Sequence, residues 1–502
     1  MKKLTVCLLI FVLALSLFGL VACGKKHDCV ANEDGYCTEC NEPVPTEGVY
    51  YKNCGTYAAV QGYTGDATTV VIAKTYNELP VTTVEADAFK YGTFKKMVLP
   101  EGITHIEENA FRGCTGLEKI DLPSTLKKID EAAFSNCSGL KSLVIPASVE
   151  EIGAGALAGC GSLESLTLPF VGARKDTTKD SKYQYPYGYI FGKAKFTPAR
   201  PTTQEYIGKY LDETEEAVFY IPTSLISLTV TGGEILYGAF TSCSMLEEVN
   251  LPENLTYIGD DAFTGCRGLK SIEIPDSITH IGDGAFYMCE KLEGTEKDSL
   301  IYLGNQGNPY LCLYSATGGG LKEMTIADGC RFVTGDFVNY CSSLEKITVP
   351  ASVEMLSPYA LVNSLALETI IVAEDSKYYK SVDNCLYTKD GKTLVRYAPG
   401  KTGTNFVAPE GLENVGEFAF ALCMGIERVE LPSTLKTIGA YAFLSCRYLS
   451  RVVLQNGEGW LYTESYYDFL DGVGRETSLD DPVAAAEAML YETHYYWMKK
   501  AK

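Results

Sequence analysis

The sequence predicts a mostly β repeat solenoid, a right-handed coil of units of about 23 residues with short parallel strands and a C-terminal helical cap. Three observations predict this fold. A segment of the form Ala-Phe-x-x-Cys recurs along the chain, apolar residues keep a fixed spacing around each copy, and proline often follows the last of them. The composition, 46% hydrophobic and 21% charged over 502 residues, is that of a folded chain rather than a disordered one.

Each repeat is marked by one large apolar residue, and neighbouring markers are 22 to 24 residues apart except where three insertions separate them. The markers are Phe89, Phe111, Phe134, Leu157, Phe240, Phe263, Phe286, Phe337, Leu361, Phe420 and Phe443. A unit of this length cannot bury its own apolar face, so the units must stack with equivalent residues in register. Repeats are therefore expected over residues 88–455, with insertions near 171–223, 300–321 and 378–397.

A short strand is predicted after each marker. Apolar residues stand six, nine and eleven positions later, as at Leu117, Ile120 and Leu122, and Pro123 follows them. The last positions alternate with a period of two, so the apolar pair faces inward and the residue between them faces outward. Proline ends the strand because it cannot donate a backbone hydrogen bond.

Cysteine recurs three residues after the marker. These cysteines are Cys114, Cys137, Cys160, Cys243, Cys266, Cys289, Cys423 and Cys446. A residue repeated on coil after coil is most simply a buried ladder, in which the thiol behaves as a small hydrophobe. Disulfides between successive coils are the alternative, but pairing would not require a cysteine on every coil. A structural ladder is therefore predicted.

The unit L-x-x-I-x-L-P…I-G-x-x-A-F-x-x-C resembles the BspA-like leucine-rich repeats of bacterial surface proteins, and the resemblance covers residues 62–455. The segment 62–84 also resembles the first coil of that family, so residues 47–87 are expected to form the N-terminal cap and first coil. The resemblance implies an extracellular, non-enzymatic protein that serves in adhesion or recognition.

The N-terminus is typical of an exported protein. Lys2 and Lys3 precede an apolar stretch from Leu4 to Val21, which is the pattern of a signal peptide. The ending Leu-Val-Ala-Cys resembles the lipobox of bacterial lipoproteins. That resemblance implies removal of residues 1–22, a lipid on Cys23, and a position on the extracellular face of the cell membrane. A non-lipidated signal peptide and a transmembrane anchor are the alternatives.

The chain is strongly acidic, with a formal net charge of −21. Such a chain repels the phosphate backbone, which argues against nucleic acid as a partner. The negative charge favours solubility and basic partners. The sequence predicts no particular oligomeric state.

A group of possible metal ligands lies in the expected linker, residues 23–46. The group follows the pattern H-x-C-x7-C-x2-C and consists of His27, Cys29, Cys37 and Cys40. Zinc favours four nitrogen or sulfur ligands, and a C-x2-C turn supplies two of them. A segment this short needs a staple to fold, so either a structural zinc or disulfides that include Cys54 are expected. No other cofactor is predicted.

The first insertion carries a run of aromatic residues interleaved with lysine, proline and glycine. The candidate binding residues in it are Tyr183, Tyr185, Tyr187 and Tyr189. Tyrosine gives a large contact area at a low entropic cost and is common on recognition surfaces. The alternative is that these rings pack against the edge of the solenoid. The other two insertions are expected to form hairpins, because Asp390-Gly391 is a strong hairpin signal and Asn308-Pro309 marks a turn.

Outward positions of the predicted strands lean acidic. Binding surfaces of repeat proteins lie on the concave sheet and on insertions, so these carboxylates are candidate contacts for a partner. They are Glu247, Glu248, Glu273 and Glu427. An ordinary solvated surface explains the pattern equally well.

Residues 456–502 leave the repeat pattern and are expected to cap the last coil. Asp481 and Pro482 form a helix start, with aspartate at the N-cap and proline in the first turn. The helix is expected to run through the alanine-rich segment 484–490 and on to Trp497.

No residue pattern points to catalysis. His105 and His280 occupy a position that varies freely between coils, as a surface column does, and no nucleophile, metalloprotease or phosphate-loop motif is present. The expected function is that of a cell-surface lipoprotein that binds a protein or a glycan. An envelope scaffold without a host ligand is the main alternative, and a carbohydrate-active enzyme is a remote one.

Overall fold

The computed structural model describes residues 29–181, 184–207, 214–317, 320–335, 342–464, 466–470, 472–491 and 493–500. Five predicted features lie outside these residues. They are the signal peptide 1–22, the lipidation site Cys23, the candidate ligand His27, the candidate binding residue Tyr183 and the marker Phe337. Within the described part of the chain, no helix has both the length and the apolar composition needed to cross a bilayer.

The segments with the L-x-x-I-x-L pattern form short parallel strands, as predicted, and we call them the outer strands. They are β3 (Thr69–Val71), β6 (Lys96–Val98), β8 (Lys119–Asp121), β10 (Ser142–Val144), β12 (Ser165–Leu168), β15 (Ser227–Val230), β16 (Glu248–Asn250), β22 (Glu323–Thr325), β24 (Lys346–Val349), β26 (Thr369–Val372), β30 (Asn405–Val407), β32 (Arg428–Leu431) and β34 (Arg451–Leu454). In β8, Ile120 is buried and both its neighbours are exposed. This is the alternation that the sequence predicts.

A second set of short parallel strands, not predicted from the sequence, lies on the other side of the coils, and we call them the inner strands. They are β5 (Leu79–Val84), β7 (His105–Ile106), β9 (Lys128–Ile129), β11 (Glu151–Ile152), β17 (Tyr257–Ile258), β18 (His280–Ile281), β21 (Cys312–Ala316), β23 (Phe332–Val333), β25 (Met355–Leu356), β29 (Thr393–Tyr397), β31 (Asn414–Val415) and β33 (Thr437–Ile438). Each ordinary coil contributes its core residue five positions before the marker, so that Ile106 lies opposite Ile129.

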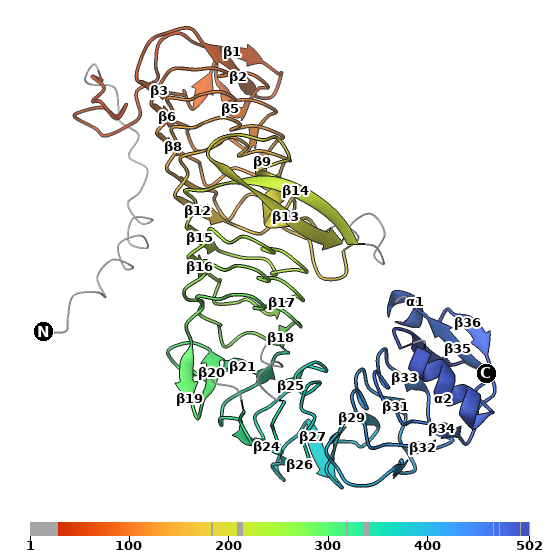
Figure 1. Cartoon of the computed structure of the whole chain (residues 1–502). Helices are drawn as coiled ribbons and strands as arrows, with labels where there is room; N and C mark the ends of the chain where they lie inside the picture. The colour runs from red at the N-terminus through yellow and green to blue at the C-terminus, as the bar shows by residue number, and fades with distance from the viewer. Residues whose placement is uncertain are drawn as a thin grey trace, which may run out of the picture.

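The stacked coils form a long arm that bends and returns as a shorter one, which brings β31 and β33 round towards the side of the first arm that carries β17 and β18 (Figure 1). The outer strands lie on the outer side of this bend and the inner strands on its inner side. The bend falls where two coils lack the Ala-Phe-x-x-Cys turn, in the segments 312–325 and 393–407. The missing turn belongs to the inner side, and the axis bends towards that side.

Both of these coils carry the predicted hairpins. In the first, β19 (Thr295–Lys297) and β20 (Leu300–Leu303) pair antiparallel, and β20 pairs antiparallel with β21. In the second, β27 (Tyr379–Val382), β28 (Cys385–Thr388) and β29 pair in the same way. Gly391 stands in the turn between β28 and β29 with a φ of 79°, as the Asp-Gly signal requires.

The core is built from columns of identical side chains. The rings of Phe111 and Phe134 stack with their centroids 5.1 Å apart and their planes 2° from parallel. Phe89 continues this stack on the coil before, at 5.3 Å from Phe111. Phe420 and Phe443 stack in the same way in the second arm, at 5.0 Å. These buried faces provide the continuous apolar core that a single coil lacks.

The predicted cysteine ladder is confirmed, and its thiols make a regular hydrogen bond. The Sγ of Cys137 donates to the carbonyl oxygen of Phe111 on the preceding coil at 3.1 Å. Cys446 donates to Phe420 in the equivalent way at 2.9 Å. Cys114, Cys160, Cys266 and Cys289 donate in the same way. These thiols thus fill the core and satisfy a buried backbone acceptor, which explains why the residue recurs.

The first insertion replaces one inner turn of the solenoid. It contains the 3-10 helix η1 (Tyr187–Ile190) and the antiparallel hairpin of β13 (Ala199–Ile207) and β14 (Thr214–Pro222). Backbone hydrogen bonds join η1 to both neighbouring coils, from Tyr187 to Ala239 and from Leu157 to Ile190. The insertion therefore completes a coil before the hairpin leaves it.

Both ends of the solenoid are capped. At the N-terminus β1 (Val49–Asn53) pairs antiparallel with β2 (Ala58–Tyr63), β2 pairs parallel with β5, and β4 (Thr75–Tyr76) flanks β5. The C-terminal cap contains β35 (Trp460–Thr463), α1 (Tyr466–Leu470), β36 (Arg475–Thr477), α2 (Pro482–Tyr491) and β37 (Tyr496–Lys499). Asp481 caps α2 as predicted, with its Oδ1 accepting from the backbone of Val483 and Ala484.

The prediction that this helix continues to Trp497 is wrong. The helix α2 ends at Tyr491, and the aromatic segment after it forms the strand β37. β37 pairs antiparallel with β33 and β35, and this pairing buries Trp497 and Met498 over the last coil. The edge of the inner sheet presents unpaired backbone groups. Pairing with them stabilises this segment as a strand more than its local propensity stabilises a helix.

Candidate recognition surface on the inner side of the bend

The turns that follow the inner strands place carboxylates and aromatic rings on the inner side of the bend. We call this set the inner surface. It consists of Tyr237, Asp260, Asp261, Asp283, Ser357, Tyr359, Glu417, Phe418 and Tyr441. Asp260, Asp283 and Glu417 occupy the same register position, two residues after the core residue of an inner strand. A glycine precedes each of them in the sequence, and at Gly282 a side chain would meet the backbone nitrogen of Asp260 at 2.3 Å. Glycine therefore lets successive coils approach closely here.

The carboxylates of the two arms interact electrostatically across the bend. Burial raises the pKa of Asp283 to about 6, a hydrogen bond from Ser357 opposes the shift, and the charges of Asp260 and Glu417 add to it. Burial also raises the pKa of Glu417, against a hydrogen bond from Tyr496, and the charge of Asp260 contributes. Asp260 and Asp283 belong to the first arm and Glu417 to the second, so each arm influences the titration of the other.

Aromatic rings lie beside the carboxylates. The rings of Tyr359 and Phe418 pack with centroids 4.5 Å apart, and Phe418 stacks on Tyr441 at 5.1 Å. Tyr359 remains 41% exposed. Burial raises the pKa of Tyr359 to about 12, with further contributions from the charges of Glu417 and Asp283. The phenol is therefore neutral at physiological pH and available as a hydrogen-bonding group.

The half-buried carboxylates of Asp283 and Glu417 and the exposed carboxylate of Asp260 lie beside the exposed ring of Tyr359, whereas Phe418 is buried. Asp283 and Glu417 are partly desolvated, so an incoming positive charge or hydrogen-bond donor recovers interactions that water no longer supplies. An aromatic face attracts cations and packs against flat apolar surfaces. The inner surface therefore favours ligands with ammonium, guanidinium or hydroxyl groups and disfavours anions.

The acidic residues selected from the sequence lie elsewhere. Glu247, Glu248, Glu273 and Glu427 belong to the outer side of the coils, the first two at β16 and the last just before β32. Glu247 forms an ion pair with Lys270, and the other three are exposed. Glu248 and Glu273 lie on adjacent coils, because Glu248 pairs with Ser271, whereas Glu427 lies in the second arm. The sequence contained the signal for the inner carboxylates, a Gly-Asp or Gly-Glu pair after the core residue, but not which side of the coil becomes concave.

The tyrosines of the first insertion largely serve the solenoid itself. Tyr187 is completely buried, and its ring packs against Phe240 at 5.2 Å, so it fills the marker column and is not available to a partner. Tyr185 and Tyr189 are half-buried and pack on each other at 4.5 Å. Tyr183 lies outside the described residues. Packing against the solenoid, the alternative interpretation of this run, is correct for Tyr187.

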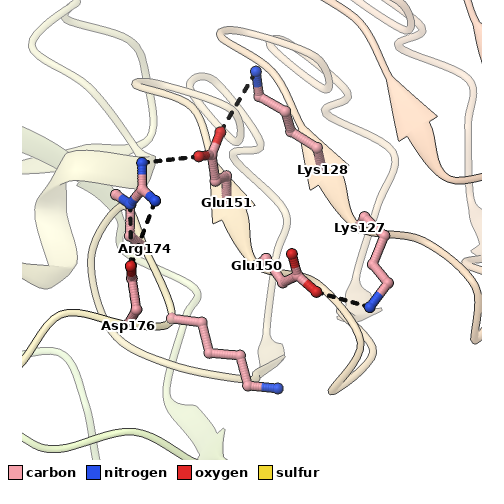
Figure 2. Close-up of a pocket in the computed structure, with 7 residues that line it drawn as sticks. Lys127, Lys128, Glu150, Glu151, Arg174 and Asp176 are labelled. Atoms are coloured by element: carbon pink, nitrogen blue, oxygen red, sulfur yellow. Dashed lines mark hydrogen bonds and ion pairs between the residues drawn. The ribbon is translucent and has the colours of Figure 1, made fainter.

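A second depression, of about 590 Å³, lies where the first insertion leaves the inner strands β9 and β11. Figure 2 shows its charged lining, in which Lys127 pairs with Glu150 at 2.8 Å and Arg174 bridges Glu151 and Asp176 at 3.0 Å each. Four basic and three acidic side chains line this depression, so its net charge is only +1. Exposed ion pairs of this kind contribute little free energy, and the small net charge gives little selection of a ligand.

Three of the four predicted metal ligands do come together. The sulfur atoms of Cys29, Cys37 and Cys40 all lie within 4.8 Å of one another. This cluster lies in the N-terminal segment, ahead of the first strand, and is separate from the inner surface. Cys54, the possible disulfide partner, is not part of the cluster.

The family described as BspA type leucine rich repeat region matches the chain in six copies, over residues 77–173, 203–306, 313–389 and 400–469. These ranges cover more than half of the chain. The chain belongs to the BspA-type leucine-rich repeat family. Proteins of this family typically take part in surface interactions, and their repeat is a scaffold that is not typically enzymatic.

Solved structures of other bacterial repeat proteins resemble the chain. A leucine-rich repeat protein from Bacteroides ovatus is 22% identical, with 81% of this chain and 93% of that one covered and a TM-score of 0.31. A leucine rich cell surface protein from Faecalibacterium prausnitzii is 21% identical, with 86% and 98% covered and a TM-score of 0.31. The leucine rich repeat protein of T. pallidum is 24% identical, with 50% and 90% covered and a TM-score of 0.29. No curated protein matches the chain.

Proposed function

We propose that this BspA-type protein is a lipid-anchored recognition module of the cell surface, which holds a protein or a glycan on the inner surface of its bend. The N-terminal sequence supports the location, since residues 1–22 have the pattern of a signal peptide and Cys23 ends a lipobox-like segment. In this proposal Cys23 fixes one end of the chain to the membrane, and the solenoid carries the inner surface away from it.

One observation carries the binding role. Asp260, Asp283 and Glu417 are equivalent by register and interact electrostatically across the bend with one another and with Tyr359, whose exposed ring packs on Phe418 at 4.5 Å. Asp260 accepts a hydrogen bond from the backbone nitrogen of Asp283 at 2.8 Å, but the fold does not need three neighbouring carboxylates for this bond. Their repulsion and the partial burial of Asp283 and Glu417 both cost free energy. Carboxylates that are kept together despite this unfavourable free energy are typical of a functional site.

The chemistry of the inner surface narrows the ligand class. A protein segment with lysine or arginine side chains fits both the carboxylates and the aromatic faces. An amino sugar presents the same positive charge, and neutral glycans present hydroxyl groups that carboxylates can bind. The net charge of −21 opposes nucleic acid and other polyanions. The proposal contains no chemical step, so ligands are expected to leave unchanged.

The proposal is tested with the purified chain from residue 23 onward, labelled at a surface lysine. It is applied to a glycan array and to immobilised matrix proteins, mucins and bacterial envelope proteins, at physiological ionic strength. We expect reproducible retention by basic proteins or by amino-sugar glycans, weakened by added salt. Retention only by bacterial envelope proteins would favour the scaffold alternative, and hydrolysis of an array glycan would favour an enzyme. No retention by any of these would contradict the proposal.

A further inference from the structure

The three clustered cysteines of the N-terminal segment have the geometry of metal ligands. Their sulfur atoms lie within 4.8 Å of one another, and the sulfurs of Cys29 and Cys40 are 4.0 Å apart. A tetrahedral zinc ion with Zn–S bonds of about 2.3 Å holds its sulfurs about 3.8 Å apart. A disulfide bond instead needs a separation of about 2.0 Å and uses only two of the three sulfurs. The cluster therefore matches a shared ion better than a pair.

The backbone of residues 29–46 turns tightly around the cluster, and we call this segment the knuckle. The amide of Asn41 donates to the carbonyl of Cys37 at 2.9 Å, and the amide of Cys37 donates to the carbonyl of Glu42 at 2.7 Å. Asn41 adopts the left-handed conformation with a φ of 57°, which asparagine tolerates well. This turn presents Cys37 and Cys40 on one side, and the segment before it brings Cys29 to them.

Hydrophobic burial cannot hold this segment. In residues 29–46 only Gly35 and Cys37 are buried. A chain segment of this length without an apolar core does not fold by itself unless a covalent or metal crosslink supports it. A structural metal site explains why three thiols lie close together in a segment that has no apolar core.

The knuckle is also attached to the first coils of the solenoid. The hydroxyl of Thr69 donates to the carbonyl of Glu33 at 2.7 Å, and Lys96 forms an ion pair with Asp34. A side chain at Gly35 would collide with Val71 at 2.4 Å, so the turn lies directly on β3. Ordering the knuckle therefore also covers the outer strands nearest the N-terminus.

We propose that Cys29, Cys37 and Cys40 bind a structural Zn²⁺ ion that staples the N-terminal segment to the first coils. The three thiols release their protons on binding and coordinate as thiolates. An ion held by these three cysteines crosslinks residues 29–40 and serves the stability of the N-terminal segment. The ion holds the chain between the lipid-anchor position and the repeats.

The test measures zinc directly in the full chain, purified under reducing conditions without added chelator. Elemental analysis is expected to find about one zinc per chain in the wild type. Cys37→Ser and Cys40→Ser are expected to lose at least four fifths of it, whereas Cys54→Ser, a matched cysteine outside the cluster, is expected to retain it. Cobalt substitution is expected to give the absorption bands of tetrahedral thiolate coordination in the wild type and Cys54→Ser only.

Three results would overturn the proposal. They are less than about one tenth of a zinc per chain in the wild type, zinc retained in Cys37→Ser, and an intact mass two hydrogens lower, which shows a disulfide between cluster cysteines. A chelator is expected to expose residues 29–46 to proteolysis while the thermal unfolding of the repeats stays unchanged, which separates loss of the staple from general unfolding.

Discussion

The guanidinium Nη2 of Arg396 donates a hydrogen bond to the carbonyl oxygen of Val362 at 3.2 Å and so joins coils on either side of the third insertion. The same group donates to the carbonyls of Ala421, at 2.9 Å, and Phe418. Arg396 is buried, and burial lowers its pKa. This side chain occupies the place of the missing Ala-Phe-x-x-Cys turn and satisfies carbonyl groups that the turn would otherwise have bonded.

Replacing Arg396 is expected to loosen the bend. Arg396→Met keeps much of the volume but removes the guanidinium donor from the carbonyls of Val362 and Ala421, at about 1–3 kcal/mol each. The carbonyl of Phe418 keeps a hydrogen bond from the backbone nitrogen of Ala421. We expect a large fall in Tm and, in small-angle X-ray scattering, a wider angle between the arms. Arg267→Ala, which removes an exposed arginine, serves as the control. An unchanged scattering profile and Tm in Arg396→Met would show that the guanidinium does not set the bend.

The cysteine ladder predicts a graded effect of substitution at Cys137. Cys137→Ala removes a buried atom and the hydrogen bond to the carbonyl of Phe111, so we expect a loss of about 1–3 kcal/mol. Cys137→Ser retains a donor for that carbonyl and is expected to be less destabilised than Cys137→Ala. Urea unfolding followed by circular dichroism measures both. The opposite order would indicate that packing alone, without the hydrogen bond, explains the ladder.

The first insertion depends on one buried amide. Gln204 accepts from the backbone of Gly188 at 2.7 Å and donates to the carbonyls of Ala239 and Thr241. Gln204→Ala leaves the amide of Gly188 and the carbonyl of Thr241 without this partner, whereas the carbonyl of Ala239 keeps its bond from Tyr187. We therefore expect faster hydrogen exchange in residues 184–207 and 214–223 while the coils of the second arm stay protected. Thr203→Ala, an exposed neighbour on the same strand, is the control. Equal exchange in both variants would contradict the role of Gln204.

The raised pKa of Asp283 predicts a pH dependence of stability. The folded chain holds this proton up to a pH of about 6, whereas the unfolded chain releases it near 3.8. Between these values the folded state binds more protons, so the contribution of Asp283 to stability falls as the pH rises through this window. Asp283→Asn is expected to be more stable than the wild type above pH 6, by about 1–2 kcal/mol, and to lose this part of the pH dependence. Thermal unfolding from pH 4 to 7 measures it, and a difference that grows towards pH 4 would contradict the assignment.

The sequence predicts the parts of this protein that depend on local chemistry repeated many times. The marker column, the outer strands and the cysteine ladder each depend on one side chain per coil in a fixed register, and the structure contains all of them. The hairpin at Asp390-Gly391 and the helix start at Asp481 are equally local, since each follows from the conformation of two residues.

The bend could not be predicted in the same way. The bend depends on two coils that lack a turn and on the burial of Arg396 between the neighbouring coils. Both involve contacts between residues that are far apart in the sequence. The inner surface follows from the bend, so Asp260, Asp283 and Glu417 are recognisable as a group only once the arms are seen to converge. Selecting outward positions of the strands led instead to Glu248 and its equivalents on the outer side.

The central claim, recognition by the inner surface, is tested most directly by comparing two triple variants in one binding measurement. One variant carries Asp260→Asn, Glu417→Gln and Tyr359→Ala on the inner surface, and the other carries Glu248→Gln, Glu273→Gln and Glu427→Gln on the outer side. Each is titrated against the ligand that the wild type retains, after circular dichroism has shown both to be folded. We predict at least a tenfold loss of affinity for the inner variant and less than a twofold change for the outer one. Equal affinity in the inner variant and the wild type would contradict the claim.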